Sequence, residues 1–393
     1  MALLEGYLDE LGTDSLTKHQ MGEAWQRLGA TIEVSSSTNY FMLTIKGFDQ
    51  NLEPSLRLLR HWLTSLKPDA DAAKELASEY KMSYKQQDRT NSSVMPMVLS
   101  MILRGNQSEY LMQPTPQEVK KMKAEELLQL FTDECQYHCD VLYCGTQSSQ
   151  AIAGLCRQYL SFLTPHLAPV DTEIRYQQYD EPVVYVYDMP DSRQTYVGAY
   201  GSVKPSLTDK EDALLALWSQ YMGGSMYSVL FQEIREYRSM AYSTGGYSFT
   251  PNRARHNDYP SGYIAYLGTQ TDKSMQALNV LDSVLQQMPV NEQNVASARQ
   301  EILNEINNGY PSFRQLSHFI SSYRASSYRE DPKARRARIV PTLQADDMVA
   351  FYQQEIQAKP RIWFIIGNKK QLDMQALAKY GKVVELKRQD VMR

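Results

Sequence analysis

The segment Met222-Gly-Gly-Ser-Met-Tyr-Ser-Val-Leu-Phe-Gln-Glu-Ile-Arg-Glu-Tyr-Arg-Ser-Met-Ala-Tyr-Ser243 says more about the fold than any other part of the 393-residue chain. Its two adjacent glycines predict the end of one helix, and Ser225 is a favourable N-cap for the next. That second helix carries apolar residues at helical spacing, namely Val229, Leu230, Phe231 and Ile234. Arg235 falls in its last turns, and Tyr242 falls in the strand expected to start at Met240. The segment therefore predicts a helix-to-strand corner at which an Arg and a Tyr can point into the same space.

This corner resembles the one in the C-terminal half of pitrilysin/insulysin-type zinc peptidases. Those enzymes show Gly-Gly-x-x-x-Ser, Leu-Phe-x-x-x-Arg-Glu and Ala-Tyr-Ser in the same order. In that family the Arg and the Tyr reach the catalytic half and hold the substrate at its zinc ion. The resemblance implies the same role for Arg235 and Tyr242. The simpler alternative is a solvated Arg near a helix C-terminus, followed by an ordinary strand Tyr.

The composition excludes some classes of function. A formal net charge of -4, with 22% charged and 42% hydrophobic residues, is typical of a globular protein and gives no electrostatic case for nucleic acid. The basic cluster Lys333–Arg338 follows Glu330 and Asp331, so a solvated helix face or loop is expected there. No apolar run approaches the length of a membrane span, and no signal peptide opens the chain.

The order of expected elements shows one supersecondary pattern twice. In the first copy, helices are expected at 2–11, 16–28, 56–66, 70–86, 93–103, 124–136 and 151–163, and strands at 31–35, 40–45 and 141–144. In the second copy, strands are expected at 183–187, 195–200, 240–249, 262–268, 362–366 and 383–386, and helices at 209–221, 225–236, 272–288, 292–307, 313–328, 346–357 and 372–380. We predict an α+β fold of two similar domains, 1–165 and 175–393, each a mostly antiparallel sheet with helices on one face. The first copy lacks the two opening strands of the second, as if the chain began inside a domain.

The resemblance also says where a zinc site would lie. Catalytic halves of the family carry His-x-x-Glu-His on a helix that ends in Gly-Thr, where two imidazoles bind zinc and the Glu activates its water. Alignment on Gly12 and Thr13 puts Leu3 and Tyr7 at the histidine positions and Gly6 at the Glu position. The nearby Glu5 is one residue out of register. No catalytic zinc is expected in this chain.

Other possible ligands are also weak. The family's third ligand would correspond to Glu79 or Glu75, but without imidazole partners a surface carboxylate is the better interpretation. No two of the six histidines are three or four residues apart; they are His19, His61, His138, His166, His256 and His318. Cys135, His138 and Cys139 lack the paired Cys-x-x-Cys spacing of structural zinc sites, and Cys144 falls in an expected strand, Val141–Cys144. A stripe of Tyr259, Tyr263 and Tyr266 could line a carbohydrate or peptide surface, although strand packing explains most tyrosines more simply.

The interpretation that follows is the non-zinc-binding, substrate-holding half of a zinc endopeptidase that encloses and cleaves peptides. The chain alone should be inactive and hold no cofactor, with zinc in a partner half that carries His-x-x-Glu-His, either in the same full-length chain or in a separate subunit. The expected partners are that half and a peptide substrate. A non-catalytic structural subunit on the same scaffold, as in the core proteins of respiratory complexes, and a stand-alone peptide-binding subunit remain alternatives. The residues leave the compartment open, and the resemblance is compatible with a periplasmic or otherwise exported protein.

Overall fold

The computed structural model describes residues 2–37, 40–163, 165–168, 176–251 and 259–393. The chain divides into two compact units, the first made of Met1–Gln86, Pro114–Glu173 and Phe313–Ser317, and the second of Gln87–Gln113, Ile174–Ser312 and His318–Arg393. Residues 87–113 thus belong to the second unit although they lie in the first part of the sequence. The division into domains 1–165 and 175–393 stays a prediction.

The first unit surrounds a two-stranded sheet with helices. The helices are α1 (Ala2–Asp9), α2 (Lys18–Arg27), α3 (Leu52–Ser65), α4 (Ala70–Gln86), α7 (Pro116–Lys121), α8 (Ala124–Glu134) and α9 (Ser149–Tyr159). Strands β1 (Thr31–Ser36) and β2 (Phe41–Lys46) pair antiparallel, with Thr31 opposite Lys46. Thr17 begins α2 with a capping box that it forms with Gln20. A single core joins α1 to the tryptophans of α2 and α3.

The predicted strand Val141–Cys144 is wrong, because these residues form no strand. Val141 and Leu142 are exposed, and hydrogen bonds to one carboxylate hold the segment instead. Asp49 accepts from the backbone N–H of Thr146 at 2.7 Å, from its hydroxyl at 2.6 Å and from the Tyr143 hydroxyl at 2.8 Å. The bonds from Thr146, and then the one from Tyr143, lower the pKa of Asp49.

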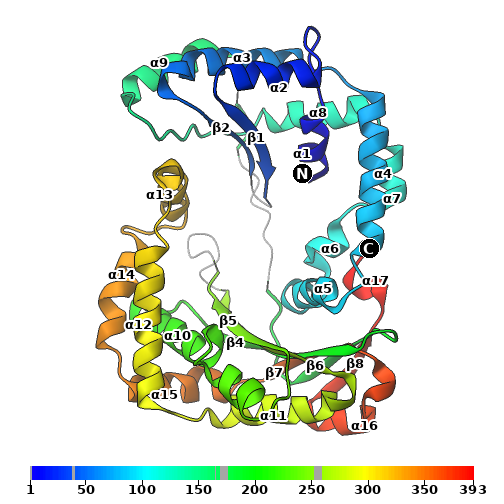
Figure 1. Ribbon diagram of the computed structural model, residues 1–393, viewed down its shortest axis with the longest axis vertical. Coiled ribbons are helices and arrows are strands. Elements are labelled where there is room, and N and C mark those ends of the chain that lie inside the picture. Colours follow the sequence, from blue (N-terminus) through cyan, green and yellow to red (C-terminus); the bar gives the residue numbers. More distant parts are fainter. Residues whose placement is uncertain (1, 38–39, 164, 169–175, 252–258) are drawn as a thin grey trace. The chain divides into compact units, whose positions relative to one another are not determined.

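A six-stranded sheet organises the second unit (Figure 1). Its strands, in spatial order, are β5 (Ser243–Phe249), β6 (Pro260–Gln270), β4 (Gln194–Pro205), β7 (Arg361–Gly367), β3 (Val183–Asp188) and β8 (Lys382–Leu386). The pairs from β5 to β7 are antiparallel, whereas β3 is parallel to both β7 and β8. The apolar run Ile362–Ile366 was predicted as a buried strand, and every residue of β7 is buried. The predicted α+β class with mostly antiparallel pairing is confirmed.

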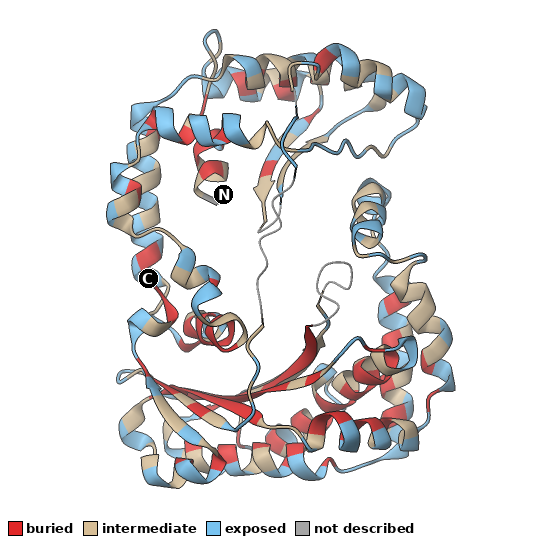
Figure 2. Ribbon diagram, turned by 180° about the vertical axis from the view of Figure 1, so that it is seen from behind, coloured by how far each residue is buried: buried red, intermediate tan, exposed pale blue. Residues whose placement is uncertain are grey.

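Helices cover the sheet unequally. One face packs alternate strand residues against a helical layer that includes α10 (Asp209–Ser219), α11 (Ser274–Gln287), α12 (Glu292–Asn308) and α15 (Ala345–Tyr352). Helix α5 (Asn91–Arg104) lies on the opposite face from α11 (Figure 1). The Asn91 side chain fixes α5 there, because it donates to the backbone oxygens of Gln194 at 2.8 Å and Ile366 at 2.9 Å. Figure 2 shows how burial concentrates along these strands and along the sheet side of the helices.

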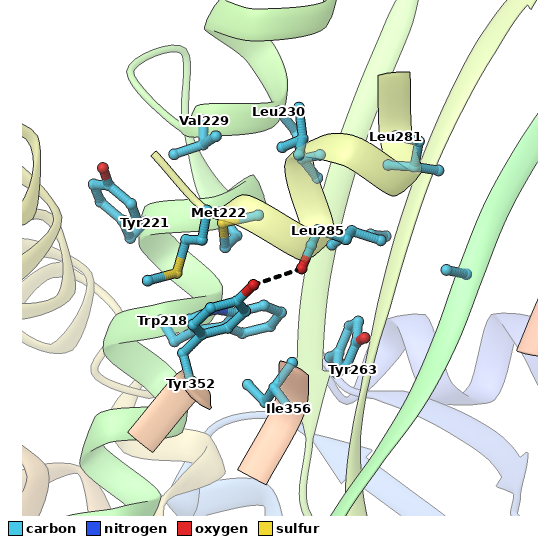
Figure 3. Close-up of a cluster of buried hydrophobic side chains, with 14 of the residues drawn as sticks. Trp218, Tyr221, Met222, Val229, Leu230, Tyr263, Leu281, Leu285, Tyr352 and Ile356 are labelled. Carbon is cyan, nitrogen blue, oxygen red and sulfur yellow. Dashed lines mark hydrogen bonds between the residues drawn. The ribbon is translucent and has the colours of Figure 1, made fainter. Parts of the chain in front are cut away.

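The core between the sheet and the helical layer combines aliphatic and aromatic side chains (Figure 3). The rings of Trp218 in α10 and Tyr263 in β6 meet edge to face, with centroids 4.8 Å apart. The buried hydroxyl of Tyr352 donates to the backbone oxygens of Leu285 at 2.8 Å and Gln286 at 2.7 Å, so it is satisfied at the end of α11.

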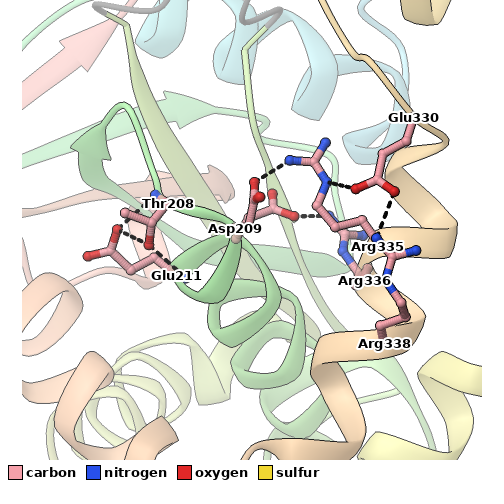
Figure 4. A network of polar contacts seen from close by, with 8 residues as sticks. Thr208, Asp209, Glu211, Glu330, Arg335, Arg336 and Arg338 are labelled. Carbon is pink, nitrogen blue, oxygen red and sulfur yellow. Dashed lines mark hydrogen bonds and ion pairs between the residues drawn. The ribbon is translucent and has the colours of Figure 1, made fainter.

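The basic cluster forms a helix, but it is not simply solvated. Helix α14 (Pro332–Ile339) points Arg335 to Asp209 and Arg336 to Asp212, both in the first turn of α10, while Arg338 pairs with Glu330 (Figure 4). The Arg335 side chain is only 18% exposed. The expectation of a solvated face is therefore wrong for Arg335. Two carboxylates more than 120 residues away in sequence thus pair with two of its four basic side chains.

The segment that suggested the fold is held by a contact between glycines. After α10 the chain continues as a wide π-helical turn, η3 (Gln220–Gly224), and becomes extended at Ser225. Gly223 lies against Gly246 of β5 so closely that a Cβ on Gly223 would be 2.4 Å from the Gly246 nitrogen. A side chain cannot fit between two backbones at that separation.

We expect Gly223→Ala to destabilise the second unit by about 1–3 kcal/mol, because the added methyl group must push backbone away from backbone. Gly22→Ala is the matched control: it lies in α2, where a Cβ meets nothing within 4 Å. The control should be neutral or more stable by roughly 0.5–1 kcal/mol, since alanine favours a helix. Urea unfolding followed by circular dichroism measures both. Equal stability of the two variants would contradict the glycine contact.

Candidate functional site

Arg235 lies in η4 (Phe231–Glu236), the wide final part of the helix that begins at Val229. Leu230 and Ile234 are completely buried and fix the helix to the core. Arg235 is exposed, and its guanidinium carbon lies 4.9 Å from the centroid of the Phe231 ring. This cation–π contact orients the side chain. Among the described residues none accepts a hydrogen bond from it, so its five N–H donors remain available to a ligand.

The backbone turn after this helix places Tyr242 beside strand β6 of the sheet. Ser239 adopts φ 51°, a left-handed conformation that ends the helix, and the N–H of Met240 donates to the Ile234 oxygen at 3.0 Å. The N–H of Tyr242 then donates to the Gly268 oxygen at 2.9 Å. Regular strand β5 starts at Ser243, slightly later than the predicted start at Met240.

The Tyr242 side chain is 59% exposed. Its hydroxyl oxygen accepts a hydrogen bond from the Gln270 side chain at 2.9 Å. A phenol has one O–H donor besides its acceptor positions, so this contact orients the oxygen and leaves the proton for another acceptor. η4 and β5 pack against each other, so both predicted site residues stand exposed on neighbouring segments of one unit. Together they offer cationic and neutral donors to a ligand with carbonyl or oxyanion oxygens.

The helix that would hold zinc in a catalytic half is a core helix here. Tyr7 of α1 is completely buried, and the Asp69 N–H donates to its hydroxyl at 2.9 Å. The same oxygen lies 3.4 Å from the backbone oxygens of Asp69 and Ala124. Burial raises the pKa of Tyr7, which keeps the phenol neutral. Leu3 is half-buried and has no donor atom for a metal.

The carboxylates of the first unit do not assemble into a metal site. Glu5 accepts a hydrogen bond from the Ser36 hydroxyl at 3.0 Å, and Glu75 and Glu79 are exposed on α4. Burial raises the pKa of the Cys135 thiol to about 11, so it is a poor thiolate ligand at neutral pH. Within the described residues no group of three His, Cys, Asp or Glu side chains could hold a metal ion.

The tyrosine stripe expected in β6 is divided between environments. Tyr259 and Tyr263 are buried, and Tyr263 belongs to the core with Trp218. Tyr266 projects to the other face of the sheet and is half-buried. Sequence inspection alone also gave no role to Tyr196 and Tyr247, which share this second face; the period-two alternation of strands β4, β5 and β6 was the available signal.

A cavity of about 800 Å³ opens elsewhere in the second unit. It is lined by the C-terminal end of α5, by Tyr176, Gln177 and Tyr185, and by the last helix, α17 (Arg388–Val391). Its charged groups are already engaged, since Arg104 pairs with Glu109 at 2.7 Å and Asp390 accepts from the Lys387 N–H at 2.7 Å. The cavity therefore offers less free charge to a ligand than the Arg235 and Tyr242 region.

Comparison with known proteins also relates this chain to an inactive peptidase domain. Residues 136–302, which include the whole corner segment, match the sequence profile of the peptidase M16 inactive domain. This part of the chain is similar to a peptidase M16 inactive domain. The resemblance to the non-zinc-binding C-terminal half of a pitrilysin-type peptidase is confirmed at that level. No curated protein matches the chain.

Solved structures share the fold. A peptidase M16 inactive domain from Pseudomonas fluorescens matches with a TM-score of 0.70 and 15% identity over 93% of this chain and 87% of that one. A protease from Helicobacter pylori gives 0.70 and 12% over 93% and 88%. The periplasmic protease PqqL from Escherichia coli gives 0.71 and 13% over 94% of this chain and 40% of PqqL. This chain thus spans less than half of PqqL. Among the described residues, no helix is both long and apolar enough to cross a membrane.

The position of Tyr7 yields a stability prediction. Tyr7→Phe keeps the ring but removes the acceptor of the partly buried Asp69 N–H, so we expect the first unit to lose about 0.5–1.5 kcal/mol of unfolding free energy. Tyr227→Phe, at a hydroxyl that is part of a 61% exposed side chain, is the control and should change nothing measurable. Denaturant unfolding of both variants tests this. A Tyr7→Phe variant as stable as the control would show that the hydroxyl is not structural.

Proposed function

We propose that this chain is the substrate-holding half of a two-half zinc endopeptidase, with the zinc ion and its His-x-x-Glu-His ligands in the other half. The observation that supports the proposal is that two hydrogen-bond donors, Arg235 and Tyr242, are both exposed on segments that pack against each other. In the same chain, α1 has a buried Tyr7 where a catalytic half would have a zinc ligand. A domain that only supported a partner would have no need of both donors in the open. The other half could belong to the same full-length polypeptide or to a separate subunit.

The chemistry assigns a different task to each side chain. Addition of water to a peptide bond places negative charge on the former carbonyl oxygen, and a fixed phenol O–H would be a suitable donor to it. Gln270 holds the Tyr242 oxygen, so its proton can turn toward that charge without rotation of the ring. The planar guanidinium of Arg235 suits neighbouring peptide carbonyls, because its donors lie in one rigid plane. Both groups act on the substrate, while activation of water belongs to the zinc-bearing half.

The first expected outcome concerns the chain by itself. The purified chain should not cleave peptides, with or without added zinc, because α1 offers neither the imidazoles nor the carboxylate that zinc hydrolysis requires. A quenched fluorescent peptide with added zinc, and the same assay with a chelator, measures this. Zinc-dependent cleavage that the chelator abolishes would overturn the assignment of α1 as a helix without catalytic function.

The second expected outcome concerns the pair, in the enzyme reconstituted with its zinc-bearing half. Tyr242→Phe should lower kcat by roughly 10²–10³-fold, the usual loss when one donor to an oxyanion is removed. Arg235→Ala should also raise KM, because part of its contribution is made in the ground state. Tyr237→Phe is the matched control, since Tyr237 is 71% exposed and lies between the two residues in sequence.

Zinc content and association of the halves should be unchanged in all three variants, because none of these side chains is buried. If Tyr242→Phe retains the kcat of the Tyr237→Phe control, the pair does not serve catalysis. The alternative of a structural or peptide-binding subunit on the same scaffold would then replace the enzyme.

A further inference from the structure

The sheet face opposite α11 has an unusual surface in its first three strands, β5, β6 and β4. Aromatic side chains on one strand lie flat across glycines on the next. A Cβ on Gly268 would be 2.8 Å from the Tyr196 ring, and a Cβ on Gly245 would be 3.1 Å from the Tyr266 hydroxyl. The strand register explains this, because Tyr196 is opposite Gly268 and Tyr266 is opposite Gly245. Because Gly268 and Gly245 have no side chains, the rings of Tyr196 and Tyr266 can pack directly over the backbone of the neighbouring strand.

Only part of this floor is covered. Tyr200 and Phe364 are completely buried, and the Tyr179 ring, whose hydroxyl bonds the Ile102 oxygen of α5, packs on Tyr200. Toward the β5 edge, none of the described residues covers the rings completely. Tyr196 and Tyr266 are half-buried, and Tyr247 is 47% exposed. We call these three residues the tyrosine floor. Their strand positions place them on one face, since Tyr247 is two residues beyond Gly245 along β5.

The floor has hydrogen-bonding capacity as well as apolar area. No described residue makes a hydrogen bond to the hydroxyl of Tyr196, Tyr247 or Tyr266. The buried hydroxyl of Tyr352, by contrast, is satisfied by backbone oxygens. Flat rings with free O–H groups suit a ligand that is apolar in the middle and polar around it. A large side chain flanked by peptide groups has this character.

The strand register places the floor close to the proposed site. Tyr196 is opposite Gly268, Gly268 is opposite Ser243, and Ser243 follows Tyr242 directly. Adjacent strands are about 4.8 Å apart, so two strands span roughly 10 Å, which is about three residues of an extended peptide. A peptide group held at Tyr242 can therefore place a side chain about three residues away on the floor.

We infer that Tyr196, Tyr247 and Tyr266 form a subsite that selects peptides with an aromatic or large aliphatic side chain about three residues from the bond held at Tyr242. The inference rests on the proposed function for its choice of a peptide as the ligand. The rings supply stacking and apolar contact, and the hydroxyls bond the flanking peptide groups. The three side chains carry no charge, so the floor offers no ion pair to an acidic or basic side chain.

The test measures peptide binding to this chain without its zinc-bearing partner. Two fluorescein-labelled peptides of Gly, Ser and Ala differ at one central position, which is Phe in one and Ala in the other. In fluorescence anisotropy we expect saturable binding of the Phe peptide, about 3–10-fold tighter than that of the Ala peptide, the range typical of one aromatic contact. Tyr247→Ala and Tyr266→Ala should each reduce this preference, whereas Tyr266→Phe, which keeps the ring, should retain most of it.

Tyr310→Ala is the control, because Tyr310 is 59% exposed and lies outside the sheet. It should bind both peptides as the unaltered chain does, and circular dichroism should show that all variants are folded. Equal binding of the two peptides, or equal loss of preference in the control, would overturn the inference. Binding of an oligosaccharide such as cellohexaose in place of the Phe peptide would overturn it as well.

This outcome is separate from that of the proposed function. A normal kcat in Tyr242→Phe would refute the catalytic role of the pair and leave peptide selection by the floor intact. An absent Phe preference would refute the floor and leave the kinetics of Tyr242→Phe unaffected.

Discussion

The arrangement of the candidate site depends on the backbone contact between Gly223 and Gly246. It holds the turn after α10 against the edge strand β5 with no side chain between them. The helix that carries Arg235 lies between Gly223 and Gly246 in the sequence, and so does Tyr242. Buried Leu230 and Ile234 then fix the rotation of the helix, and that rotation leaves Arg235 outside. The positions of Arg235 and Tyr242 thus depend on Gly223, whose missing side chain lets the turn approach β5.

Burial of Tyr7 in the first unit contrasts with the exposure of the candidate site residues in the second. In the first unit α1 is an apolar core helix, and Tyr7 occupies the interior with its hydroxyl satisfied by backbone. A metal site there would need several polar groups to be buried together, which costs free energy unless the metal compensates. In the second unit, Arg235 and Tyr242 are instead exposed, and the helix that carries Arg235 is fixed by the buried side chains of Leu230 and Ile234. Under the proposed function, this chain contributes substrate contacts to a reaction whose metal lies in another half.

The sequence predicted the features that local patterns encode. The run Ile362–Ile366 is apolar without interruption and is indeed buried on both faces. Ser239 follows the end of the corner helix as predicted, whereas that helix begins at Val229 and not at Ser225, which is extended and does not cap it. Features that depend on distant partners were not predictable. Val141–Cys144 has strand composition but finds no strand to pair with, and Arg335 finds a carboxylate 126 residues away. The tyrosine floor needs the register of three strands, which no single segment contains.

The central claim is that Arg235 and Tyr242 contact a substrate that is cleaved at a zinc ion held by another half. A crystal structure of the chain together with its zinc-bearing half and an uncleaved peptide tests this most directly. The account predicts that the Tyr242 hydroxyl and the Arg235 guanidinium lie within hydrogen-bonding distance of peptide oxygens next to the zinc, with Tyr7 still buried and no metal at α1. A peptide bound at the zinc with neither side chain in contact, or a zinc ion bound by α1, would contradict it.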